Sequence, residues 1–176
     1  MQRLNSVNPE TAEGRTKELL NTAQRIFGVV PNAAKVMANS PAVLQSWLTF
    51  SQTMGEASIG EKLQNQIFLS TSESNSSDYC TSILCAVTPN FGLTPDDILA
   101  GRTGNSEDRR INAALKFAEA VLENGGKVSD QQLDAMRQAG FNNAEIVEVV
   151  ASVVLGCLAN FLNNVADIDE QERKFH

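Results

Sequence analysis

The sequence predicts an all-α protein. Helix-start signals recur along the chain, apolar residues return every three or four positions after each of them, and no stretch shows the alternation typical of a strand. With 176 residues, 42% of them hydrophobic, the chain is long enough to bury one sizeable core. We therefore expect a single helical domain over residues 1–176, made of about seven to nine helices.

In the first half of the chain, three helices are expected from their boundaries. The first begins at Asn8-Pro9 and ends near Phe27, because proline favours the first helical turn and Gly28 favours a stop. Ser40-Pro41 opens the second helix in the same way. The third begins near Gly60 and leads into a serine-rich segment.

The second half carries four further helix starts, each built from a capping side chain with acidic or amide residues behind it: Thr94-Pro95-Asp96-Asp97, Ser106-Glu107-Asp108, Ser129-x-x-Gln132 and Asn142-x-x-Glu145. The last of them opens a long helix to about Val165. Its stretch 146–162 is apolar around most of its circumference, so we expect it to be buried on nearly all sides. It serves either as the core helix of the domain or partly as a contact with a second subunit.

The charge and the apolar pattern exclude several kinds of partner. A net charge of −7 disfavours binding to a phosphate backbone, so no nucleic acid is expected. No apolar leader begins the chain, and the stretch 146–162 is interrupted by Glu148, Ser152 and Asn160, short of the about 20 residues that a bilayer requires. The expectation is a cytoplasmic protein without a membrane segment.

Cysteine and histidine are scarce. Three cysteines at these spacings form neither a disulfide framework nor a metal knuckle, and the single histidine, His176, excludes multi-histidine metal sites and triads. Cys80 and Cys85 diverge by about 140° on one helix and could not bridge there. Cys157, within an apolar run, is interpreted as a small buried hydrophobe. No metal and no cofactor are expected.

The segment 72–84 reads Ser-Glu-Ser-Asn-Ser-Ser-Asp-Tyr-Cys-Thr-Ser-Ile-Leu and resembles a redox dithiol motif that keeps one thiol, Cys80. It is similar to the motif Asn-x-Cys-x-Tyr-Cys-x-x-x-His of the carboxymuconolactone decarboxylase and alkyl hydroperoxidase D family, with Asn75, Tyr79 and Cys80 in frame. Further similar segments cover most of the chain: Val30-Pro31-Asn32, Ser40-Pro41-Ala42-Val43-Leu44, Gly92-Leu93-Thr94, Ala139-Gly140-Phe141 and Asn160-Phe161-Leu162-Asn163.

The resemblance implies an alkyl hydroperoxidase D-like helical domain that assembles as a dimer, trimer or hexamer. In the family, the two cysteines cycle between dithiol and disulfide, while a glutamate and the histidine relay protons. The matching positions here are Ser77 for the first cysteine, Leu84 for the histidine and Asn65 for the glutamate. Three of the four relay positions therefore carry no redox or proton chemistry.

The candidate catalytic residues are Cys80, Glu73 and Asp78. Ser77 is expected to cap the helix that holds Cys80, whose place in the first turn favours a thiolate, although the neighbouring Asp78 carboxylate opposes it. The expected pocket is lined by five side chains: Asn65, Ser77, Tyr79, Ile83 and Leu84. Ile83 and Leu84 make it more apolar than the family pattern, as suits a small apolar or aromatic ligand.

Three functions remain open. The first is a divergent relative that has lost two-cysteine peroxidase chemistry and binds or transforms a small organic molecule, without cofactor, near Cys80. The second is a one-cysteine peroxidase or thiol oxidoreductase, an antioxidant protein that acts through Cys80. The third is a non-catalytic oligomeric binding protein. Whether the chain is an enzyme is left undecided by the residues.

Overall fold

A computed structural model describes residues 2–167. In this range the chain is helical without a strand, and its elements in order are α1 (Gly14–Phe27), α2 (Asn32–Met37), α3 (Pro41–Met54), α4 (Gly60–Ser74), α5 (Asp78–Val87), the 3₁₀ helix η1 (Thr88–Phe91), α6 (Pro95–Thr103), α7 (Arg109–Glu123), α8 (Asp130–Gln138) and α9 (Asn143–Ala166). The predicted all-α class is confirmed.

Side-chain caps explain why several helices begin where the sequence predicts. Complete capping boxes open α6 at Thr94, α8 at Ser129 and α9 at Asn142, each pairing two backbone N–H groups that a helix start leaves free. The cap of α7 is Asp108, at the end of the predicted start signal.

The expected start of the first helix at Asn8-Pro9 is wrong. The Asn8 side chain accepts a hydrogen bond from the Glu10 backbone N–H at 2.9 Å. The Asn8 backbone carbonyl accepts another from the Ala12 backbone N–H at 3.0 Å, so the chain turns there. Helix α1 begins only at Gly14. Helix α2 was not expected, since it has six residues and no side-chain cap.

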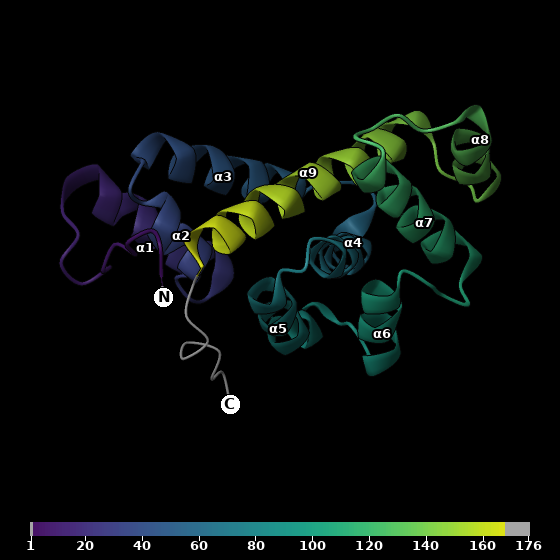
Figure 1. Cartoon of the computed structure of the whole chain (residues 1–176). Coiled ribbons are helices and arrows are strands. Elements are labelled where there is room, and N and C mark those ends of the chain that lie inside the picture. Colours follow the sequence, from purple (N-terminus) through teal and green to yellow (C-terminus); the bar gives the residue numbers. More distant parts are fainter. Residues whose placement is uncertain (1, 168–176) are drawn as a thin grey trace.

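Helix α9 crosses the whole molecule, with α1 to α3 near its C-terminal half, α7 and α8 near its N-terminal half, and α4 seen almost end-on beneath its middle (Figure 1). The crossing with α4 is close at Gly156, where an added Cβ would lie 3.3 Å from the Thr71 Cγ2. Helix α6 approaches α4 in the same way at Gly101. Small residues thus let three helices pack tightly beside the segment 72–84.

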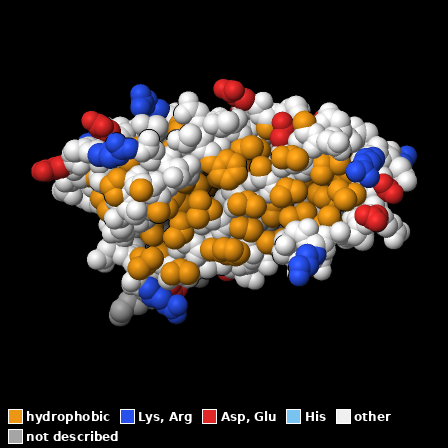
Figure 2. All heavy atoms as spheres, turned by 90° about the horizontal axis from the view of Figure 1, so that it is seen from above, with side chains coloured by type: hydrophobic (Ala, Val, Ile, Leu, Met, Phe, Trp, Pro, Cys, Tyr) orange, Lys and Arg blue, Asp and Glu red, His pale blue; other side chains and the backbone are white. Residues whose placement is uncertain are grey.

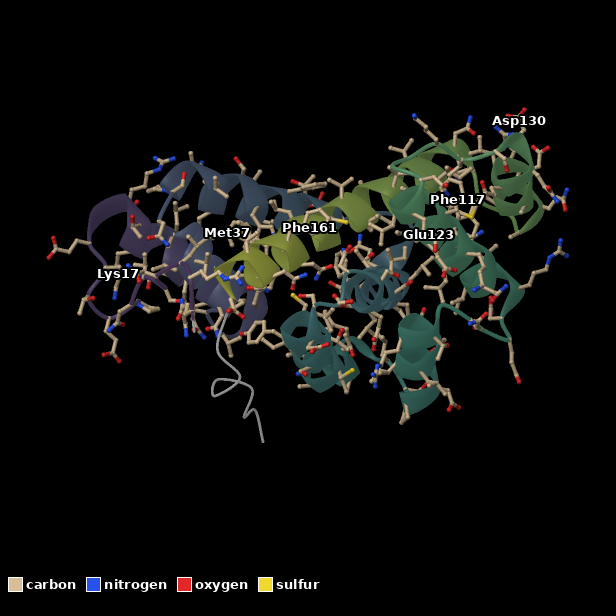
Figure 3. All side chains as sticks on the ribbon, in the orientation of Figure 1. Lys17, Met37, Phe117, Glu123, Asp130 and Phe161 are labelled. Atoms are coloured by element: carbon tan, nitrogen blue, oxygen red, sulfur yellow. The ribbon has the colours of Figure 1, made fainter. Side chains whose placement is uncertain are left out.

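Two hydrophobic clusters lie at opposite ends of α9, marked in Figure 3 by Phe117 and Met37. The first joins α4, α7 and α8 to the N-terminal half of α9, through Val149 and Val153 among others. The second joins α1, α2 and α3 to its C-terminal half, and contains Trp47 stacked on Phe27 at 4.9 Å. Leu155 belongs to the second cluster, so α9 ties the two together.

The expectation that the apolar helix is buried on nearly all sides is wrong for the single chain. Val147, Val154, Phe161 and Val165 are between 52% and 66% exposed. By length and composition α9 could cross a membrane, and 33% of its most apolar window is buried inside the protein. The other alternative left open by the sequence, a contact with a second subunit, concerns this exposed side.

Candidate functional site

A three-residue turn between α4 and α5 positions the candidate cysteine. Ser76 adopts a left-handed conformation with φ of 50°, and the Ser77 backbone N–H returns to the Ser72 carbonyl at 2.9 Å. Helix α5 then starts at Asp78, which places Cys80 in its first turn. Ser77 occupies the N-cap position, but its hydroxyl makes no capping hydrogen bond, contrary to our expectation.

The sulfur of Cys80 is directed toward α9. Cys80 is 9% exposed, and its Sγ accepts a hydrogen bond from the Asn163 Nδ2 at 3.0 Å. The Asn163 Oδ1 and the Ser77 Oγ are buried without a hydrogen-bond partner among the described residues. An unpaired buried polar atom costs about 1–3 kcal/mol, and the Gln66 Oε1 and the Thr88 Oγ1 are further atoms of this kind away from the turn.

A network of amide side chains fixes this turn on α9. Asn75 donates from its Nδ2 to the Asn160 Oδ1 at 3.1 Å, and Asn160 donates in turn to the Ser72 Oγ at 3.0 Å. The Asn164 Nδ2 closes the set on the Asn75 carbonyl at 2.9 Å. Cys157 lies beside it, and burial raises the pKa of its thiol against the opposing contact from Asn75. These hydrogen bonds hold the turn before α5, and with it the start of the helix that carries Cys80, against α9.

The candidate carboxylates lie elsewhere on α4 and α5. Glu73 forms an ion pair with Arg102 of α6, with 2.5 Å between its Oε1 and the Arg102 Nε, and Asp78 is exposed. Burial raises the pKa of the Cys85 thiol, which Arg102 counteracts and Glu73 reinforces. Cys85 thus belongs to the α6 side and Cys80 to the α9 side. No described contact brings Glu73 or Asp78 to Cys80.

The remaining predicted pocket residues divide between two places. Tyr79 and Ile83 line a cavity of about 200 Å³, whose opposite wall is the segment 29–32 with Lys35 of α2. Asn65 is half-buried and donates to the Glu61 carbonyl of its own helix at 2.9 Å, while Leu84 is half-buried one turn beyond Cys80. A larger open depression, about 740 Å³, lies over α1 and includes no residue of α5, so it has no connection to this chemistry.

Sequence reasoning missed Asn163, Asn32 and Lys35 as parts of the site. Asn160 and Asn163 stand three apart in a mostly apolar helix, which is a detectable signal for a polar inner contact. Asn32 and Lys35 carried no such signal, because the short helix α2 was not foreseen. Within residues 2–167, no three His, Cys, Asp or Glu side chains gather where a metal ion could bind.

Fold and site together define a class. It is a helical protein in which a cysteine lies in the first turn of a short helix, α5, and this helix packs against two longer crossing helices, α4 and α9. The fold is that of the alkyl hydroperoxidase D core. No protein-family model matches the sequence, and no curated protein matches it. The evidence for the fold comes from solved structures.

An uncharacterized peroxidase-related protein from Ralstonia eutropha JMP134, described as an alkylhydroperoxidase AhpD core, superposes with a TM-score of 0.83 at 18% identity, over 96% of this chain and 91% of that one. A cysteine-to-alanine variant of the debrominase Bmp8 in complex with 2,3,4-tribromopyrrole gives 0.81 at 16%, over 96% and 91%. A peroxidase-related protein from Silicibacter sp. TM1040 gives 0.76 at 17%, over 96% and 94%. The resemblance stated from the sequence is confirmed for the fold.

Proposed function

We propose that this protein binds or transforms a small organic molecule, without a cofactor, in the cavity beside Tyr79 and Ile83. In this proposal it has lost two-cysteine peroxidase chemistry. The observation that carries the proposal is this cavity, which adjoins the helix that holds Cys80. Its walls are mostly apolar, with polar groups from Asn32, Lys35 and Tyr79. The protein acts as a homo-oligomer in the cytoplasm.

The size of the cavity limits the ligand. Its volume of about 200 Å³ is smaller than the about 300–1,000 Å³ that is usual for pockets of drug-sized ligands. A compact molecule with a single ring fits such a space. Support for this class also comes from the debrominase Bmp8, a structural neighbour that binds 2,3,4-tribromopyrrole.

Ligand binding is the direct test. We expect 2,3,4-tribromopyrrole or its bromine-free parent, pyrrole, to shift the methyl NMR signals of Val29 and Val30, which line the same cavity, in a saturable way. Ile83→Trp should remove this binding, because the larger ring occupies the cavity. Leu99→Trp, on the exposed side of α6, is the matched control and should leave binding unchanged. Absence of saturable binding for both probes and for phenol and benzoate at millimolar concentration would contradict the proposal.

A second function, one-cysteine thiol chemistry, is favoured by a separate observation: the 3.0 Å hydrogen bond from the Asn163 Nδ2 to the Cys80 Sγ. The thiolate is the reactive form of a cysteine, and the Asn163 amide holds the Cys80 Sγ in a defined position. The thiolate would attack one oxygen of a hydroperoxide, the O–O bond would break, and the alkoxide would leave and take up a proton. Cys80 would become a sulfenic acid, which an external thiol must reduce.

A further inference from the structure

The connection between α7 and α8 begins with Asn124-Gly125, the single Asn-Gly pair of the sequence. Asn124 is the C-cap of α7 and is exposed, and Gly125 and Gly126 follow it with φ of 58° and 82°. Figure 3 labels Glu123 and Asp130, the residues of α7 and α8 that flank this connection. The Asn-Gly pair thus lies at the surface, where water reaches the main chain.

The turn at this point is a Schellman motif with one ordinary and one weak hydrogen bond. The Gly126 N–H donates to the Val121 carbonyl at 2.8 Å, whereas the Gly125 nitrogen lies 3.5 Å from the Leu122 carbonyl, which is longer than an ordinary bond. Among the described residues, no heavy atom beyond the chain neighbours of Gly125 lies within 4 Å of the place where a Cβ would be. The Gly125 nitrogen is therefore weakly bonded, in open surroundings.

This arrangement places a nucleophile beside an electrophile. A base in solution takes the proton of the Gly125 amide, the nitrogen attacks the Asn124 Cγ, and the bond from Cγ to the side-chain nitrogen breaks. That nitrogen takes a proton from water and leaves as ammonia, and a succinimide ring remains. Water then opens the ring at either carbonyl, which gives aspartate or isoaspartate. Because the attack is intramolecular, it is favoured over direct hydrolysis of the side-chain amide.

We propose that Asn124 is a site of spontaneous deamidation, by which the protein acquires an aspartate or isoaspartate at the end of α7 without an enzyme. In the folded turn Asn124 has ψ of 8°, and the main chain must rotate from there before the Gly125 nitrogen reaches the Cγ. Glycine permits this rotation. The rotation also breaks the hydrogen bond from Gly126 to Val121, so the reaction requires the end of α7 to open. Helix ends open at low cost in free energy.

An exposed Asn-Ser pair of the same chain, Asn105-Ser106, lacks these features. The Ser106 N–H donates to the Asn112 Oδ1 at 3.1 Å, so this nitrogen is engaged in an ordinary hydrogen bond. Its side chain also restricts the rotation that glycine permits. Asn105 is therefore an internal reference for the reactivity of Asn124.

Deamidation weakens the end of α7. The Asn124 Nδ2 donates to the Ala120 carbonyl at 2.9 Å, and a carboxylate has no hydrogen to donate there. The new negative charge also lies at the C-terminal end of the helix, which carries the negative end of its dipole. Val121, in the same turn, is buried and belongs to the hydrophobic cluster of α4, α7, α8 and α9. The product should therefore loosen α7 against this cluster.

Peptide mapping by mass spectrometry tests the reaction on the full chain, incubated folded at neutral pH. Asn124 should convert to the acid at least about tenfold faster than Asn105, a difference of about 1.4 kcal/mol in the barrier. Asn124→Gln should remove the conversion, because the longer side chain closes a ring less readily. Conversion of Asn124 no faster than that of Asn105 would overturn the proposal.

Two further measurements test the opening and the consequence. A synthetic peptide of residues 119–130 should convert faster than the folded chain, and an equal rate would overturn the requirement for opening. Asn124→Asp should lower the Tm of the full chain by about 2–4 °C, whereas Asn21→Asp, exposed in the middle of α1, should leave it unchanged. An unchanged Tm for Asn124→Asp would overturn the inferred loosening of α7.

Discussion

At the sulfur of Cys80, the hydrogen-bond donor is a neutral carboxamide. The Asn163 Nδ2 donates to this sulfur at 3.0 Å, but an amide neither takes up nor releases a proton near neutral pH. Ser77, at the position of the first cysteine in the family motif, carries a hydroxyl instead, and this residue is 1% exposed. The groups that contact or flank Cys80 at these two positions are therefore an amide and a hydroxyl.

The first prediction at this scale concerns peroxide turnover. Coupled to a dithiol reductant, the native chain should reduce cumene hydroperoxide very slowly, because Ser77 and Leu84 stand where the family motif has its other cysteine and its relay histidine. The triple variant Ser77→Cys, Leu84→His, Asn65→Glu should be faster by at least about 100-fold, while single variants gain little since such groups act as a unit. Stopped-flow consumption of peroxide measures both.

Cys80→Ala is the control for this assay, with Cys85→Ala beside it. Rapid turnover by the native chain that disappears only in Cys80→Ala would contradict the loss of peroxidase chemistry and support the one-cysteine function. Dimedone labelling followed by mass spectrometry would then place the sulfenic acid on Cys80.

Sequence alone located Cys80 in a first helical turn, but could not supply its partner. Asn163 is 83 positions away, and the contact depends on how α9 rotates about its axis against α5. The ion pair between Glu73 and Arg102 could not be predicted from the sequence either, because it depends on how α6 packs against α4. Local signals determine helices, whereas the site depends on contacts between them.

Among the elements, α9 is also fastened at its N-terminal half by a carboxylate. Glu148 accepts hydrogen bonds from the Ser58 hydroxyl at 2.8 Å and the Ile59 backbone N–H at 3.0 Å, which joins α9 to the start of α4. Burial alone would raise the pKa of Glu148, but these hydrogen bonds outweigh it and hold the pKa below its ordinary value. The charged form is thus favoured in the folded state.

This depression gives stability a pH dependence. The contribution of Glu148 should be complete above the unfolded-state pKa, about 4.3, and should be lost as the pH falls through the lower folded-state value. Glu148→Gln should lower the free energy of unfolding by about 1–2 kcal/mol at pH 7 and by much less at pH 3. Urea unfolding at both pH values provides the measurement.

Glu56→Gln, an exposed carboxylate in the same connection, should change little at either pH. An equal loss at pH 7 and pH 3 for Glu148→Gln would mean that the charge of Glu148 is not what stabilises this junction.

The helices differ in how well the sequence foretold them. Capping boxes at Thr94, Ser129 and Asn142 predicted three helix starts, because the cap and the backbone it binds are neighbours in the chain. Helix α2 was not predicted, because it has no side-chain cap that the sequence could reveal. Its stability comes from the packing of buried residues such as Ala34 and Met37. The exposed side of α9 corresponds to one of the two alternatives that the sequence left open for this helix.

For the whole molecule, the proposed oligomer, with a contact through the exposed side of α9, should appear in thermal unfolding. Figure 2 shows a continuous band of hydrophobic side chains on the side of the molecule that is uppermost in Figure 1. If a folded dimer unfolds to separate chains, a tenfold rise in protein concentration stabilises it by about 1.4 kcal/mol of dimer, or about 0.7 kcal/mol per chain, which corresponds to about 2 °C in Tm. Calorimetry at two concentrations measures this shift. Val154→Glu should abolish it, and a concentration-independent Tm for the unmodified chain would contradict a dimer coupled to folding.

The position of α9 across both hydrophobic clusters also governs the order of folding. A nascent chain that has emerged only as far as Phe141 lacks the helix that completes either cluster, so Leu115 of one and Leu44 of the other remain without their final cover. Non-local closure of this kind slows folding and exposes apolar surface to other nascent chains. During synthesis we therefore expect an interval in which the apolar side chains of both clusters are exposed and can bind a chaperone. This interval should end when α9 has left the ribosome and can pack on both clusters.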